Sequence, residues 1–167
     1  MSSMPRTLGR VIDLNVAPFV PEGWTVESHR ACGSLLWNPS RNLRFYLTKA
    51  QQRSPVKGAE LHLDMEKMPV VNAALLDFLL ARLAENPRFI PPEWKYDELG
   101  RTRYIFFWGT IYRYDGDLCV RYLRWNALKW EWGYGWINNL WNSQYFALLM
   151  KELSAPGSNG LELPSAL

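Results

Sequence analysis

The side chains with the most reactive chemistry are two histidines, His29 and His62, and two cysteines, Cys32 and Cys119. A metal site would need both histidines to converge with carboxylates such as Glu27, Glu60 or Asp64. Cys32 follows His29 by three residues, whereas a cysteine nucleophile and its base usually lie far apart in sequence. Cys119 alternates within a predicted strand, where a buried and inert thiol is expected. We therefore expect no catalytic residue, no metal ligand and no cofactor, and a small metal enzyme or hydrolase at His29/His62 is the weakest alternative.

Motifs and composition also give no indication of an enzyme. The 167 residues contain no Walker loop, dinucleotide fingerprint, HExxH or nucleophile-elbow pattern. Hydrophobic residues make up 48% and charged residues 21%, with a net charge of +3, as in an ordinary globular chain. No apolar run is long enough to span a bilayer, and residues 1–10 lack the apolar segment of a secretory signal. We expect one cytoplasmic domain without membrane contact.

Basic and aromatic residues gather in one stretch, 104–141, which holds six of the nine tryptophans. The basic residues in or beside it are Arg101, Arg103, Arg113, Arg121, Arg124 and Lys129. Arginine and aromatic residues dominate protein interfaces, and on a sheet they also bind single-stranded nucleic acid. The structural alternative is that arginine stems cover tryptophan faces at a solvated sheet edge. Arg121 and Arg124 fall on opposite faces of their strand, so the basic residues do not all share one surface. This makes the nucleic-acid interpretation weaker.

The pattern of this stretch predicts a three-stranded antiparallel meander at about 104–136. Tyr104–Tyr112 is rich in aromatic and β-branched residues, which favour strands. Asp115-Gly116 suits a type I′ hairpin turn, so Leu118–Trp125 should return antiparallel. After a turn at 126–128, Lys129–Trp136 forms the third strand.

Alternation is clearest in that third strand. Trp130, Trp132, Tyr134 and Trp136 share one face, opposite Glu131, Gly133 and Gly135. Core packing explains the aromatic row, and so does an exposed stacking platform for a partner, a base or a sugar. Alternation alone does not distinguish these. The glycines indicate a bulge or a close approach to the backbone.

The remaining chain supplies the other elements. Strands are expected near 35–48, a helix near 70–86 with Asn72 as its cap, and a helix near 143–153 capped by Asn142 or Ser143. Residues 1–10 and 154–167 should be flexible ends around a single domain at 11–153. The fold class is therefore α+β, with a mostly antiparallel sheet centred on the meander and two helices packed on it.

Several segments of the chain form a specific pattern: FFWGTIYR and LCVRYLRW with the following W-W-Y-W row, and upstream VESHRACG, VVNAALLDFLL and IPPEWK. This pattern resembles a family of small, uncharacterised bacterial or phage-like proteins. The resemblance spans most of 24–141. It implies one intact domain and a bacterial or phage-like source, and it brings no activity, cofactor or catalytic residue with it.

The leading functional hypothesis is a non-enzymatic binding or accessory protein that presents an aromatic–arginine sheet surface to a protein partner. The surface residues expected to bind are Arg113, Arg121, Arg124, Trp125, Trp130, Trp132, Tyr134 and Trp136. The alternative is a nucleic-acid-binding module using the same surface, and third comes a carbohydrate-binding sheet through the tryptophan row. The identity of the partner and the oligomeric state stay open.

Overall fold

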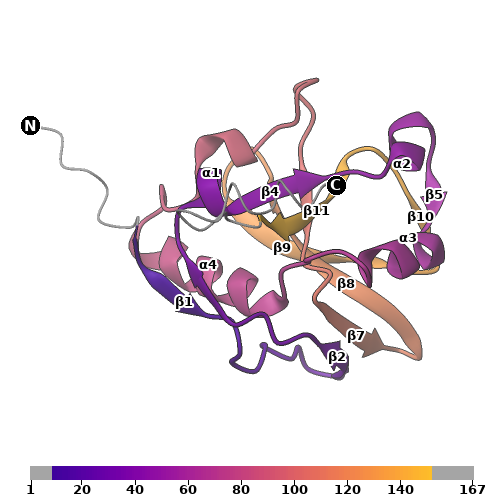
Figure 1. Cartoon of the computed structure of the whole chain (residues 1–167), viewed down its shortest axis with the longest axis horizontal. Helices are drawn as coiled ribbons and strands as arrows, with labels where there is room; N and C mark the ends of the chain where they lie inside the picture. Colours follow the sequence, from indigo (N-terminus) through magenta and orange to yellow (C-terminus); the bar gives the residue numbers. More distant parts are fainter. Residues whose placement is uncertain (1–8, 152–167) are drawn as a thin grey trace, which may run out of the picture.

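A computed structural model describes residues 9–151 of the chain. The flexible ends predicted at 1–10 and 154–167 therefore lie outside the described residues, apart from Gly9 and Arg10. The described residues form an α+β fold with a curled, mostly antiparallel sheet and four α-helices (Figure 1).

The strands are β1 (Val11–Asp13), β2 (Trp24–His29), β3 (Ser34–Leu36), β4 (Leu43–Tyr46), β5 (Val56–Lys57), β6 (Tyr104–Phe106), β7 (Thr110–Tyr114), β8 (Asp117–Trp125), β9 (Trp130–Trp136), β10 (Leu140–Trp141) and β11 (Tyr145–Met150). The helices are α1 (Pro39–Asn42), α2 (Lys49–Arg53), α3 (Gly58–Met65) and α4 (Ala73–Glu85), with a 3-10 turn at Pro92–Trp94.

The long strand β8 organises a seven-stranded sheet. One edge of β8 pairs with β9 along seven residues, and the other edge pairs first with β7 and then with β6. Beyond β7 lies β2, and beyond β6 lie β11 and β4. The β11–β6 pair is parallel, and the other pairs of the sheet are antiparallel. Two small two-stranded sheets, β1–β3 and β5–β10, complete the fold.

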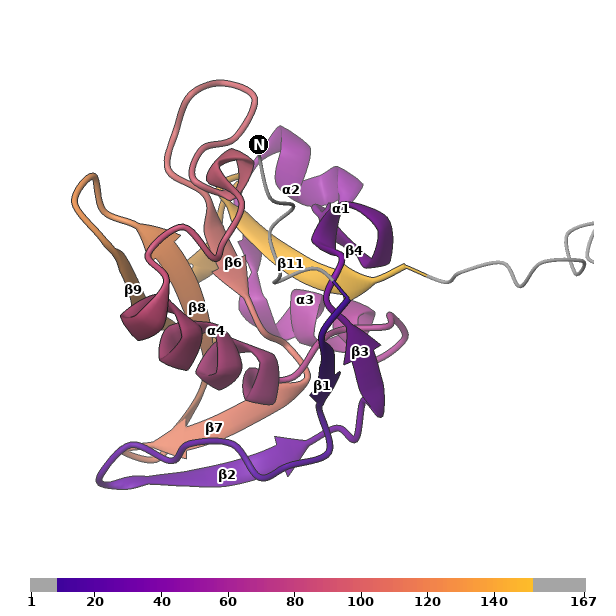
Figure 2. The ribbon, with the colours of Figure 1, turned by 90° about the vertical axis from the view of Figure 1, so that its left-hand side faces the viewer.

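Successive side chains of β8 point to opposite sides and enter two hydrophobic cores. On one side Leu123 packs with Leu75 and Leu79 of α4. On the other side Val120 packs with Leu61 and Met65 of α3. Figure 2 shows α4 on the near side of β8, with β9 at the edge of the ribbon. Both faces of the central strand are thus covered, as its apolar residues on both faces require.

The predicted helix at 70–86 is present as α4. It begins after Asn72, whose side-chain oxygen accepts a hydrogen bond from the Ala74 N–H. It ends at Glu85, before Asn86-Pro87, because proline cannot continue the helix. The hairpin turn is also present: Asp115 and Gly116 both have positive φ, 53° and 85°.

The three-stranded meander is not confirmed as the unit on which the sheet is built. Residues 104–112, predicted as one strand, divide into β6 and β7 around Phe107–Gly109. The break has a steric cause: Gly109 N donates to Val71 O at 2.9 Å, and a Cβ on Gly109 would lie 2.7 Å from Asn72 N. The chain therefore leaves the β8 ladder to pass under the start of α4.

The helix predicted at 143–153 is wrong, because residues 145–150 form β11. Its apolar run YFALLM has residues at helical spacing, but the strand lies between β6 and β4, where both of its faces are buried. A short apolar run fits either structure. The strands predicted near 35–48 also divide: β4 joins the main sheet, whereas β3 pairs with β1.

Candidate functional site

The register of β8 and β9 places most of the predicted binding residues on one face. Trp132 lies opposite Leu123, Tyr134 opposite Arg121, and Trp136 opposite Cys119. Directly opposed residues share a face. We call the face that carries Arg121, Trp125, Trp130, Trp132, Tyr134 and Trp136 the aromatic face. Arg113 and Arg124 lie on the opposite side of the sheet.

Other aromatic rings extend the aromatic face beyond β9. Trp24 of β2 stacks on Tyr114 with ring centroids 5.2 Å apart, and Tyr114 stacks on Trp136 at 5.7 Å. Exposure changes along the row, from Trp130 at 9% to Tyr134 at 37%. The row is therefore buried at Trp130, exposed at Tyr134 and half-buried at Trp136. The sequence did not predict Trp24 as part of this face, because β2 and β9 are distant in the chain and no local pattern relates them.

Arg121 is the deepest charged residue on this face, with 1% of its surface exposed. Its Nη1 donates to Asp77 Oδ1 of α4 at 2.9 Å and to the Tyr112 hydroxyl at 3.3 Å. Its guanidinium carbon lies 4.3 Å from the ring centroid of Trp132. An arginine suits such a stacked, paired site because its charge is delocalised and weakly hydrated. Arg121 thus anchors α4 to the sheet.

The segment 16–23 closes over this ion pair. Phe19 N donates to the second oxygen of Asp77 at 2.7 Å, and the Tyr112 hydroxyl donates to Phe19 O at 2.8 Å. The Phe19 ring meets Trp132 edge-on at 6.3 Å and remains 52% exposed. Burial raises the pKa of Tyr112, against a smaller lowering by Arg121. The hydroxyl therefore stays protonated and able to donate to Phe19.

The other two predicted arginines also have carboxylate partners. Arg124 donates from Nε and Nη2 to Glu131 Oε2, at 2.9 and 2.7 Å, and from Nη1 to the Tyr104 hydroxyl. This hydrogen bonding raises the pKa of Arg124 and lowers that of Glu131. Arg113 donates to Glu27 at 3.1 Å. The three arginines thus do not converge on one surface.

Strand β9 has an unoccupied backbone edge. Ile137 N donates to Leu118 O, and Asn126 N to Lys129 O. In an antiparallel ladder the hydrogen-bonded pairs recur at every second position, so Gly133 and Gly135 bond inward to β8. The N–H and C=O groups of Trp130, Trp132 and Tyr134 then point away from β8. Within residues 9–151 no strand pairs with that edge.

The two histidines line one small cavity of about 240 Å³, together with Trp108 and Glu66. His29 is held at both nitrogens: Nε2 donates to Val16 O at 3.0 Å, and Nδ1 lies 2.8 Å from the Thr110 hydroxyl. His62 lies against the Trp108 ring. No cluster of three or more histidine, cysteine or acidic residues suited to a metal occurs in the described range 9–151.

The cysteines are separate from each other. Cys119 is buried, and burial raises the pKa of its thiol to about 12. Burial also raises the pKa of Cys32. Reactive cysteines need a stabilised thiolate, which neither environment supplies.

No helix among residues 9–151 is long and apolar enough to cross a membrane. Comparisons with protein-family models, curated protein sequences and solved structures return no significant match.

Proposed function

We propose that this chain is a non-enzymatic binding protein that docks a protein partner along the free edge of β9. An extended segment of the partner would pair with the outward backbone groups of β9, and its side chains would contact the exposed end of the aromatic face. Adding a strand to an exposed sheet edge is a common mode of peptide recognition.

The observation that carries this proposal is the exposed edge itself. Exposed edges invite pairing with other chains, and proteins usually protect them with proline, lysine, bulges or very short strands. Strand β9 is seven residues long, contains neither proline nor lysine, and keeps an unbroken register with β8. Its single charged residue, Glu131, is paired with Arg124. Among the described residues, β9 therefore lacks the proline, the lysine and the bulge that usually protect such an edge.

The exposed side chains beside the edge fit a protein partner. Tyr134 is 37% exposed and Trp136 is half-buried, and across the face Phe19 and Val20 are exposed. Tyrosine and tryptophan often carry much of the binding energy at protein interfaces. Because Trp24 and Tyr114 pack against Tyr134, and Tyr114 also stacks on Trp136, little conformational entropy is lost when a partner binds.

The nucleic-acid alternative has less support. Phosphate binding needs cations free to replace counterions, and Arg113, Arg121 and Arg124 are each paired with a carboxylate. Arg121 is also buried beneath Trp132 and Phe19.

The test is affinity capture of partners from the native host, with nuclease, using the wild type and two variants at one position. Tyr134→Pro removes an outward N–H, whereas Tyr134→Ala removes the ring and keeps the N–H. Leu128→Ala, in the exposed β8–β9 loop, is the matched control. We expect a stoichiometric protein that survives nuclease and the control substitution, is reduced by Tyr134→Ala, and is lost with Tyr134→Pro.

Two outcomes would overturn this proposal. Capture of nuclease-sensitive material alone would favour the nucleic-acid alternative. A partner retained equally by folded Tyr134→Pro protein would show that the β9 edge is not the docking element. Circular dichroism of each variant verifies the fold.

A further inference from the structure

A separate cleft lies far along the sheet from β9, where β4 meets the segment 91–103. It is a cavity of about 470 Å³ between α1, β4 and the Pro92–Trp94 turn. Its apolar lining is formed by Pro39, Leu43, Phe45, Pro91, Trp94 and Leu148. A second cavity of about 430 Å³ lies on the other side of Arg103 and is lined mostly by polar residues. Arg103 lines both cavities. Trp94 lines the apolar cavity with it, and Asp97 lines the polar one.

The guanidinium of Arg103 is held in a fixed position. Its carbon lies 4.2 Å from the ring centroid of Phe45 and 4.5 Å from that of Phe146. Nη2 donates to Tyr96 O at 2.9 Å. Nε is buried and has no hydrogen-bond partner among the described residues. Two aromatic faces and one carbonyl orient this cation, and no carboxylate among residues 9–151 forms an ion pair with it.

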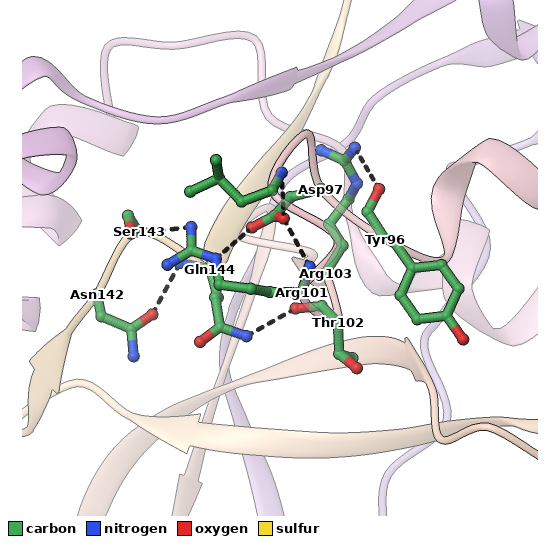
Figure 3. A network of polar contacts seen from close by, with 9 residues as sticks. Tyr96, Asp97, Arg101, Thr102, Arg103, Asn142, Ser143 and Gln144 are labelled. Carbon is green, nitrogen blue, oxygen red and sulfur yellow. Dashed lines mark hydrogen bonds and ion pairs between the residues drawn. The ribbon is translucent and has the colours of Figure 1, made fainter.

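The carboxylate of Asp97, on the same loop as Arg103, is paired with Arg101. Asp97 accepts hydrogen bonds at Oδ1 from the Leu99 and Arg101 N–H groups, and at Oδ2 from Arg101 Nε at 2.9 Å (Figure 3). Burial favours the neutral acid, but these hydrogen bonds outweigh it and lower the pKa of Asp97. Asp97 is therefore ionised and paired with Arg101, not Arg103. Burial lowers the pKa of Arg103, against smaller raising contributions from Asp97 and Glu98.

The loop that carries Arg103 is tied to the sheet, so the cleft is preformed. Arg101 Nη2 donates to the Ser143 hydroxyl at 3.2 Å, and Gln144 Nε2 donates to Thr102 O at 3.0 Å (Figure 3). Tyr96 and Thr102 also form an antiparallel bridge across the base of the loop. A site held in this way binds with little cost of ordering.

The charges around the two cavities differ. The polar cavity has Arg101 and Arg103 balanced by Asp97 and Glu98. The apolar cavity has Arg44 and Arg103 against Glu93 alone. An anion therefore gains more in the apolar cavity, where the lower polarity also strengthens its attraction to a cation.

We propose that the apolar cavity is a binding site for a small aromatic or aliphatic carboxylate. The carboxylate pairs with Arg103, whose planar fork matches carboxylate geometry. The apolar part lies against Trp94, Phe45 and Leu148. The volume and the mainly apolar lining with few polar groups are typical of small-molecule sites. This site shares no residue with the β9 edge and does not depend on the partner proposed there.

Isothermal titration calorimetry of the full chain with 3-phenylpropionate tests the proposal, with 3-phenylpropan-1-ol as the uncharged probe of equal shape. We expect saturable binding of the acid and at least about ten-fold weaker binding of the alcohol, because a hydrogen-bonded charge pair is lost. Arg103→Gln should weaken binding of the acid by a similar factor, and Arg103→Lys should weaken it less. Arg53→Gln, an exposed arginine on α2, is the control and should bind as the wild type does.

Ser40→Trp provides a second test that leaves Arg103 in place. Ser40 is exposed on α1 and lines the cavity, so its replacement fills the space from the rim without disturbing the core. We expect binding of the acid to be lost while the fold remains. Equal affinity for acid and alcohol, unchanged affinity in folded Arg103→Gln or Ser40→Trp, or no heat of binding up to about 10 mM acid would each overturn the proposal.

Discussion

Arg121 on β8 and Arg103, directly before β6, are both stacked on aromatic rings at partly or fully buried positions, yet their surroundings differ. Arg121 lies over Trp132 and donates to Asp77, and it lines none of the cavities described above. Arg103 lies against Phe45 and Phe146, has no carboxylate partner among residues 9–151 and lines two cavities. Aromatic stacking positions both cations. The presence or absence of a carboxylate separates a cation that serves the fold from one available to a ligand.

The largest loss of stability is expected when Asp77, the carboxylate partner of Arg121, is removed. Asp77→Ala leaves a buried guanidinium without its counter-charge and frees Phe19 N, so we expect the free energy of unfolding to fall by about 3 kcal/mol. Arg121→Met, which removes the charge and keeps much of the volume, should cost less. Urea denaturation measures both. Glu85→Ala on the same helix, at an exposed ion pair with Arg82, is the control and should cost little. Equal losses for Asp77→Ala and Glu85→Ala would contradict the structural role of Arg121.

The loop that carries Arg103 should weaken in acid. The pKa of Asp97 is lowered in the folded protein, so its stabilising contribution is complete above its ordinary value of 3.8 and is lost as pH falls through the lower, folded value. Asp97→Asn keeps an acceptor and removes the charge, so we expect a loss of about 1 kcal/mol at neutral pH. The difference between wild type and variant should shrink as pH falls below about 4. Urea midpoints measured at several pH values show this, and a difference that does not change with pH would contradict it.

Replacing Arg103 itself should affect stability much less than replacing Asp77. Arg103→Met keeps an unbranched apolar stem between Phe45 and Phe146 and leaves no carboxylate unpaired. We expect the free energy of unfolding to change by less than about 1 kcal/mol. A loss as large as that of Asp77→Ala would show that Arg103 is a structural cation like Arg121 and would remove the contrast between the two.

The smallest effect is expected at Arg113 and Glu27, both of which are exposed. Glu27→Gln should change stability by about 0.5 kcal/mol or less, because water and salt screen exposed pairs. The change should disappear in high salt. A larger loss that is independent of salt, measured by urea denaturation at two ionic strengths, would place this pair among the structural ones.

Local patterns predicted the elements whose causes are local. The leucine spacing and Asn72 define α4, Asp115-Gly116 defines the turn before β8, and alternation defines the faces of β9. They did not predict β11, because its apolar run satisfies both helical and strand patterns until its neighbours β4 and β6 are known. The division of 104–112 into two strands was not predicted either. It depends on the close approach of Gly109 to the backbone of a distant segment, Val71–Asn72.

The sequence by itself determined the α+β class, the aromatic row and the richness in arginine. Only the tertiary structure decided which arginine is neutralised. Asp77 is 44 residues from Arg121 in the chain, and the Phe45 and Phe146 rings that contact Arg103 come from β4 and β11. Such pairings depend on how the sheet curls and where the loops close over it. No sequence period encodes them, because charge compensation acts through space between groups that are distant along the chain.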